Sequence, residues 1–162
     1  MTLYRRILIA YDDSDTSKSA LKTAEKLAKI NDSTLTVVYV ENGSSNTMAT
    51  QSMMHDQEGN PPHLAVNDPI TDNPDQDYYY QPGKTPDQII QSAESLLSNM
   101  IEADFQILSG KPSNQIIDYS KENGIDLIVV GNRGISGVKK LFMGSVSKKV
   151  VNEADCQVLV IK

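Results

Sequence analysis

The chain has 162 residues, of which 39% are hydrophobic, and it carries a formal net charge of −6. This length suits one domain with its own core, no apolar run approaches the roughly 20 residues that span a bilayer, and the acidic balance argues against a nucleic-acid partner. Acidic residues follow the first arginines too closely for a secretory signal, and the single Cys156 excludes an internal disulfide. We therefore expect a cytoplasmic protein that binds neither membranes nor nucleic acid.

The first three elements along the chain are predicted to be a strand, a helix and a strand. Residues 5–11 form a short apolar run, and Ser14 is a suitable N-cap for the helix that follows. Apolar residues then recur at the spacing of one helical face: Ala20, Leu21, Ala24, Leu27 and Ala28. After Asn31 and Asp32, the β-branched residues of 33–40 predict a second strand.

The segment at about 42–84 differs in composition from the rest of the chain. Residues 42–83 contain six acidic residues and no lysine or arginine, which accounts for the whole net charge of −6. With few large aliphatic side chains, this segment buries too little apolar surface to offset the entropy of ordering it. We interpret it as a flexible polar insertion within a single domain that spans residues 1–162.

A second helix is predicted to begin immediately after this insertion. Thr85 is placed as its N-cap, Pro86 occupies the first helical position, and Gln88 stands three residues after the cap, which is the pattern of a capping box. An apolar helical stripe follows and extends to Ile101. Its members are Ile89, Ile90, Ala93, Leu96, Leu97, Met100 and Ile101.

The remaining residues predict two further strand–helix pairs and a last strand. Residues 104–110 form the third strand, a short helix lies around Ile116 and Ile117, and the apolar run 126–131 forms the fourth strand. A final helix then leads to the closing strand "QVLVIK". Strands and helices that alternate in this way indicate an α/β fold with a five-stranded, parallel, doubly wound sheet in three α/β/α layers. Ligands bind such sheets outside the carboxyl ends of the strands.

The stretch "GNRGISGVKKLFMGS", residues 131–145, follows the fourth strand directly. Gly131 and Gly134 leave bare backbone where the strand ends, and Gly144 and Ser145 stand at the start of the last helix. The first turn of a helix is a usual seat for phosphate, because its N–H groups are free and its dipole is positive there. Spacing alone also permits a plainer interpretation, in which the glycines serve turns and Ser145 caps the helix.

The pattern Gly131-x2-Gly134-x9-Gly144-Ser145 resembles the nucleotide-binding signature of the universal stress protein family, in its ATP-binding branch. The resemblance is not confined to this loop. The segments "ILIAYDDSDTS", "VVYVEN", "LSGKPSNQIIDYSKENGIDLIVVGNRG" and "CQVLVIK" look like the family's strands and turns. It covers nearly the whole chain outside residues 42–84 and implies a Rossmann-like fold of the adenine nucleotide alpha hydrolase type.

The resemblance also implies a binding site for ATP or another adenine nucleotide, with Mg²⁺ or Mn²⁺ as an accompanying cation. The implied nucleotide-binding residues are Ala10, Tyr11, Asp12, Val40, Val130, Gly131, Arg133, Gly134, Gly144, Ser145, Val146 and Ser147. Asp12 would lie near the ribose or adenine, and residues 144–147 would hold the phosphates. Asp13 departs from the family pattern, which commonly has glycine or an apolar residue there. Its carboxylate would either repel phosphates or help to hold the cation.

The resemblance further implies a stress-response module that forms a homodimer. The last strand, with Val158, Leu159, Val160 and Ile161, would pair antiparallel with its copy. An exposed apolar edge strand needs such a cover in any case. Two alternatives remain open, namely a module of the same fold that dimerises or docks without ATP, and a slow ATPase. Outside the insertion the chain has no histidine, so catalysis beyond weak ATP hydrolysis is not expected.

Two other short motifs resemble parts of different functional sites. The triplet "GKT" at 83–85 invites a P-loop, but a P-loop needs a glycine where Tyr78 stands and a strand before the loop. Asp12 and Asp13 resemble the acidic pair of phospho-receiver domains, but the third strand ends in "LSGKP" without the aspartate that such domains phosphorylate. Neither motif predicts a second site.

Overall fold

The computed structural model describes residues 3–42, 83–99, 101–133 and 143–162. These residues form a five-stranded parallel sheet in the order β3-β2-β1-β4-β5, with helices on both faces, so the predicted fold class is confirmed. The elements are β1 Arg6–Ala10, α1 Asp15–Asn31, β2 Thr34–Glu41, α2 Pro86–Leu96, β3 Ala103–Ser109, α3 Pro112–Glu122, β4 Leu127–Gly131, α4 Ser145–Glu153 and β5 Gln157–Ile161.

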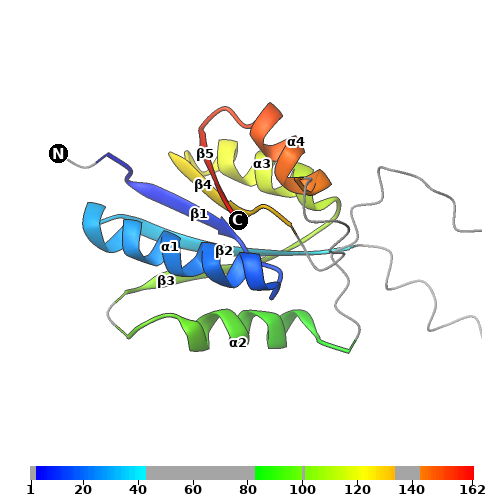
Figure 1. Ribbon diagram of the computed structural model, residues 1–162, viewed down its shortest axis with the longest axis horizontal. Helices are drawn as coiled ribbons and strands as arrows, with labels where there is room; N and C mark the ends of the chain where they lie inside the picture. The colour runs from blue at the N-terminus through cyan, green and yellow to red at the C-terminus, as the bar shows by residue number, and fades with distance from the viewer. Residues whose placement is uncertain (1–2, 43–82, 100, 134–142) are drawn as a thin grey trace, which may run out of the picture.

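The sheet separates two apolar cores. On one face, Ile7, Ile9 and Val37 pack with the apolar stripes of α1 and α2. On the other face, Leu8 and Val38 pack with α3 and α4. In Figure 1, α3 and α4 lie together at the upper right, whereas α2 lies at the bottom and α1 is drawn across the strands. Because successive side chains of a strand point to opposite faces, the continuous apolar runs of β1 and β4 serve both cores.

The predicted helix starts are confirmed at α1 and α2. The Ser14 side chain accepts a hydrogen bond from the N–H of Ser17. At α2, Thr85 and Gln88 form the reciprocal pair of a capping box, with Pro86 at the first helical position. Residues within three positions of each other specify these ends, which is why the sequence alone predicts them.

The predicted end of the second helix is wrong. The apolar stripe suggested a helix to Ile101, whereas α2 ends at Leu96, and Leu97 has an extended backbone. The reason lies in α1, because the N–H and hydroxyl of Ser98 both donate to the Glu25 carboxylate, at 3.0 and 2.6 Å. These bonds and a salt bridge from Lys29 hold the pKa of Glu25 down, to about 2.

Within the described residues, no helix has the length and apolar character that would take it across a membrane. The polar insertion predicted at 42–84 falls almost entirely outside them, and so do Gly134 and both histidines. The described chain resumes at Gly83 and Lys84, immediately before α2.

Candidate functional site

The candidate site lies where β1 and β4 end side by side. The chain adds β2 and β3 on one side of β1, and then β4 and β5 on the other, so the switch point of the sheet falls between β1 and β4. Ala10 is in register with Val130 across this point. The predicted segments 10–12 and 130–133 are therefore neighbours in space.

Asp12 is buried and bonded into the turn between β1 and α1. Its carboxylate accepts a hydrogen bond from the N–H of Ser14 at 3.0 Å and another from the Ser14 hydroxyl, and its own N–H donates to Ser17 Oγ. Burial raises the pKa of Asp12, and the hydrogen bonds from Ser14 and Ser17 oppose that rise. These hydrogen bonds thus hold the Asp12 carboxylate in place just beyond the carboxyl end of β1.

Asp13 does not behave as an open carboxylate on the phosphate path. Its side chain is 2% exposed and forms salt bridges with Lys18, at 3.2 Å, and with Lys84. The hydroxyls of Ser92 and Tyr11 donate to it as well, at 2.7 and 3.0 Å. Burial alone would raise its pKa, but these donors together lower it. Its two oxygens already serve two lysines, so the expectation that it helps to hold a cation has no support in this geometry.

Gly131 is needed for packing against α1. A Cβ atom at this position would lie 2.6 Å from Thr16 Oγ1, 2.9 Å from the main-chain carbon of Thr16 and 3.0 Å from the N of Ser17. Real Cβ atoms essentially never lie closer than 3.0 Å to another atom, so the two contacts with Thr16 could not form without a shift of the structure. The bare backbone was predicted to let a ligand approach, and the structure adds that it also lets the first turn of α1 approach the end of β4.

Residues 132 and 133, which follow Gly131, form hydrogen bonds through their main-chain atoms with β5, with Gly144 before α4 and with Thr16 of α1. The Asn132 N–H donates to Ile161 O of β5, at 2.6 Å, and its carbonyl accepts from the N–H of Gly144, at 2.7 Å. Thr16 Oγ1 donates to the carbonyl of Arg133. Within the described part of the chain, the buried Nε of Arg133 has no hydrogen-bond acceptor. Because this atom is buried, a polar ligand could accept a hydrogen bond from it only if the residues that cover it moved.

The first turn of α4 begins beside this junction. Gly144 is the N-cap, and Ser145 is the first helical residue. Val146 is buried in the apolar core, and the Ser147 hydroxyl donates to Gly131 O at 2.6 Å. The side chains of Val146 and Ser147 are therefore structural here, and what the turn offers to an anion is main-chain N–H groups.

A small apolar cavity lies next to Asp12, between the sheet and α3. Ala10, Tyr11 and Val40 of the predicted set line it, together with Val38, Pro112 and Ile116. Its volume of about 10 Å³ is room for one water molecule at most. A purine ring would enter only if the lining at the start of α3 moved.

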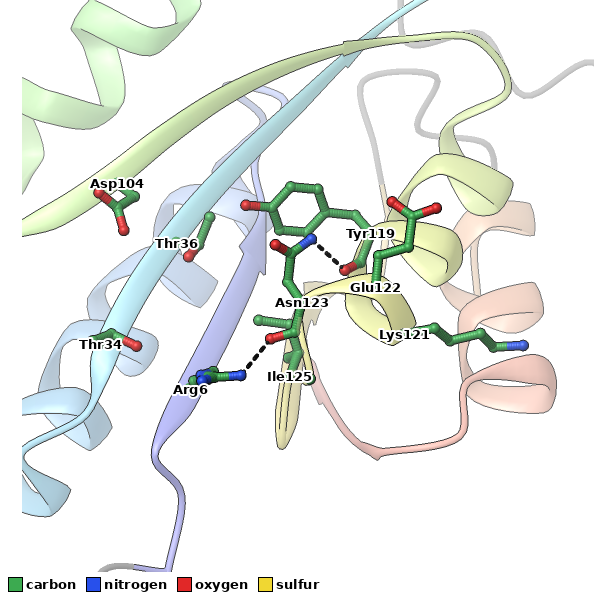
Figure 2. A pocket seen from close by; sticks show the side chains of 10 residues that line it. Arg6, Thr34, Thr36, Asp104, Tyr119, Lys121, Glu122, Asn123 and Ile125 are labelled. Carbon is green, nitrogen blue, oxygen red and sulfur yellow. Dashed lines mark hydrogen bonds between the residues drawn. The ribbon is translucent and has the colours of Figure 1, made fainter.

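A larger hollow of about 580 Å³ lies at the other end of the sheet. Figure 2 shows it between the first residues of the strands, with Arg6, Thr36 and Asp104, and the end of α3, with Tyr119. Arg6 donates to the carbonyl of Asn123 at 2.9 Å. None of the residues predicted for nucleotide binding lines this hollow.

For metals, the described residues offer no group of three His, Cys, Asp or Glu side chains that would hold an ion. A divalent cation at the candidate site would therefore depend mainly on the phosphates of a nucleotide for its ligands. Hard cations with a few protein ligands are commonly held in this way.

The structure adds residues that the sequence reasoning did not select. Lys18, Lys84 and Ser92 surround Asp13, and Thr16 meets Gly131 and Arg133. The only sequence signal for Lys84 was its place in "GKT", which was rejected as a P-loop. Ser92 lies 79 positions from Asp13 and left no signal in the sequence.

A comparison with protein families and a comparison with individual proteins point to the same family. The model of the universal stress protein family matches residues 3–162. A relative from Bacillus subtilis, the universal stress protein YxiE, is 32% identical over 161 residues, which cover 99% of this chain and 100% of the relative.

Solved structures share the fold. The universal stress protein UspA from Lactobacillus plantarum has a TM-score of 0.66 with 24% identity, and each chain is covered over its whole length. The universal stress protein from Archaeoglobus fulgidus, solved in complex with dAMP, has a TM-score of 0.61 with 20% identity, covering 99% of each chain.

Proposed function

Because the chain belongs to the universal stress protein family, we propose that it binds an adenine nucleotide, specifically ATP, and acts as a nucleotide-dependent stress-response module in the cytoplasm. The observation that carries this proposal is the convergence at the switch point. Asp12, the Gly131–Arg133 segment and the first turn of α4 meet at adjoining strand ends, where sheets of this kind bind their ligands.

The site divides into an apolar part and an anionic part. The adenine would occupy a widened form of the cavity next to Ala10 and Val40, with the backbone of Val40 at its edge and Asp12 near the ribose or adenine. The phosphates would lie along Gly131 and Gly134 against the first turn of α4, where main-chain N–H groups and the helix dipole favour negative charge. The unsatisfied Nε of Arg133 supports the same placement.

Equilibrium titration with a fluorescent ATP analogue, followed by competition with unlabelled ATP, tests the proposal. Saturable binding that ATP competes away would support it. The absence of saturable binding would favour the alternative in which this fold only dimerises or docks a partner. Dependence of the affinity on added Mg²⁺ or Mn²⁺ would support a phosphate-held cation.

The variant Asp12→Asn is expected to change thermal stability and nucleotide affinity in opposite directions. Burial raises the pKa of Asp12, so the ionised carboxylate costs stability, and that cost is complete once the pH exceeds the folded-state pKa. We expect D12N to melt at a higher temperature than the wild type at pH 7, with the gain shrinking as the pH falls toward the ordinary aspartate pKa of about 4. The same variant should bind the ATP analogue about tenfold more weakly, because an amide accepts a weaker hydrogen bond than a carboxylate.

Thermal melts at several pH values and the titration above measure both effects. Asn at this position can still accept from the Ser14 N–H, so the turn should keep its shape. A variant that melts lower than the wild type at pH 7 would contradict the assignment of Asp12 as a carboxylate held at a cost for binding.

We also propose a homodimer through β5. This strand pairs with β4 on one side and forms an edge of the described sheet on the other. Leu159 and Ile161 face one core and Val158 and Val160 the other, so a second β5 would extend both cores across the dimer. Light scattering should give twice the chain mass of 17.8 kDa. A monomer mass at micromolar concentration would contradict the pairing.

A further inference from the structure

Asp13 and its four donors form a connected group that we name the Asp13 cluster, and the donors are Tyr11, Lys18, Lys84 and Ser92. It joins three elements, because Tyr11 follows β1, Lys18 lies on α1, and Lys84 and Ser92 lie before and on α2. The Tyr11 hydroxyl also lies 3.0 Å from Ser92 Oγ. The buried carboxylate of Asp13 therefore has partners on α1, on and just before α2, and at the end of β1.

The charges of the cluster do not cancel. One carboxylate faces two ammonium groups, which leaves a net charge of +1. The Lys18 and Lys84 side chains are 37% and 46% exposed, whereas the Asp13 side chain is 2% exposed. The buried partner thus depends on the exposed ones, since a buried charge that loses its partners is costly.

The backbone at Asp13 links this cluster to the candidate site. Asp13 has φ of 65°, a left-handed conformation that few residues other than Gly, Asn and Asp adopt. This conformation turns the chain so that Asp12 bonds with Ser14 on one side of the turn, while Asp13 reaches α2 on the other. The orientation of Asp12 is therefore tied to that of Asp13.

Tyr11 provides a second link. Its hydroxyl donates to Asp13 on the side of α1 and α2, its N–H donates to Val38 O of β2 at 2.9 Å, and it lines the small cavity beneath α3. A displacement of Asp13 would move the cavity lining as well as Asp12.

We propose that Asp13 and Lys84 are positioning residues for the nucleotide: by tying the turn after β1 to α2, they hold Asp12 and Tyr11 in the arrangement that binds it. This inference rests on the proposed function and deepens it. Asp13 is then neither a repulsive charge nor a cation ligand. Lys84 of the "GKT" triplet acts through Asp13 and does not touch phosphate.

The test compares Lys84→Met, Asp13→Asn and their double variant in the ATP-analogue titration. Methionine keeps the apolar stem of Lys84, and asparagine tolerates the left-handed backbone of Asp13. We expect each single variant to bind about tenfold more weakly, and the double variant to bind no more weakly than Asp13→Asn alone, because Asp13→Asn already removes the ion pair with Lys84. Lys84→Arg, which retains a cation, should restore most of the affinity.

Lys22→Met is the matched control. Lys22 is an exposed lysine of α1, one turn beyond Lys18, and its loss changes the net charge by the same amount. We expect this variant to bind like the wild type. Without nucleotide, the amide NMR signals of Tyr11 and Asp12 should shift in Lys84→Met and stay in place in Lys22→Met.

The outcomes separate the inference from the proposed function. A wild type that does not bind the analogue would overturn both. A wild type that binds, together with a Lys84→Met variant of equal affinity, would overturn the positioning role alone. Equal weakening by Lys22→Met would also overturn it, since net charge and not the Asp13 contact would then govern affinity.

Discussion

Replacing Gly131 with alanine is expected to lower the free energy of unfolding by about 2 kcal/mol, the usual cost of overpacking a tight contact. The added Cβ would lie 2.6 Å from Thr16 Oγ1 and 2.9 Å from the main-chain carbon of Thr16. A side-chain oxygen can turn away, but a main-chain carbon in the first turn of α1 moves only with the helix. The junction of α1 and β4 must therefore open.

Urea unfolding of the wild type and the variant, followed by circular dichroism, measures this effect. Adding Thr16→Ala to Gly131→Ala is an informative control, because it removes the hydroxyl and leaves the main-chain contacts with Thr16 and Ser17 at 2.9 and 3.0 Å. We expect the double variant to recover little stability. An unchanged urea midpoint in Gly131→Ala would mean that β4 and α1 do not approach this closely.

The loss in Gly131→Ala should extend to binding. Opening the junction would displace the Thr16 bond to the Arg133 carbonyl and the turn at Asp12. Gly131 therefore also serves the site by letting α1 pack against the end of β4, in addition to its proposed place along the phosphates.

Replacing Gly144 with valine is expected to weaken binding of the ATP analogue about 30-fold, equivalent to about 2 kcal/mol. The branched side chain would enter the space where the phosphates approach the first turn of α4. The fold should tolerate the change, because Gly144 has φ of −62° and ψ of 155°, which are ordinary values for a non-glycine residue. The loss of a glycine N-cap should cost stability by about 1 kcal/mol or less.

The same titration, with a thermal melt of each variant, measures the two effects separately. Gly144→Ala is the matched control, and its single methyl group should give an intermediate affinity. Equal affinity in wild type and Gly144→Val would place the phosphates away from α4. A variant that fails to fold would contradict the ordinary backbone conformation at this position.

Much of the fold follows from local signals in the sequence. Alternating strands and helices predict the parallel sheet, and Ser14 and Thr85 mark helix starts that the structure confirms. Each signal acts over a few residues, because a cap or an apolar stripe depends on the spacing within one element. The sequence also predicts that the segments after β1 and β4 lie side by side, and the register of Ala10 with Val130 confirms that proximity.

The partners of individual side chains could not be predicted in this way. Asp13 appeared as an extra charge at the phosphates, whereas Lys84 and Ser92 hold it from 71 and 79 positions away. The end of α2 was misplaced because Ser98 bonds with Glu25, 73 positions earlier in the chain. The close contact of Gly131 with α1 was not predicted either, although a Cβ atom there would lie 2.6 Å from Thr16 Oγ1.

The sequence by itself thus determined the fold class and the starts of α1 and α2, and it predicts a nucleotide site at the strand ends that the proposed titrations will test. The tertiary structure alone decided which polar groups pair and which glycine is a packing contact. The physical reason is the range of the interactions. Propensity and capping act between neighbours along the chain, whereas the carboxylates of Asp13 and Glu25 take donors from whichever helix the fold places beside them.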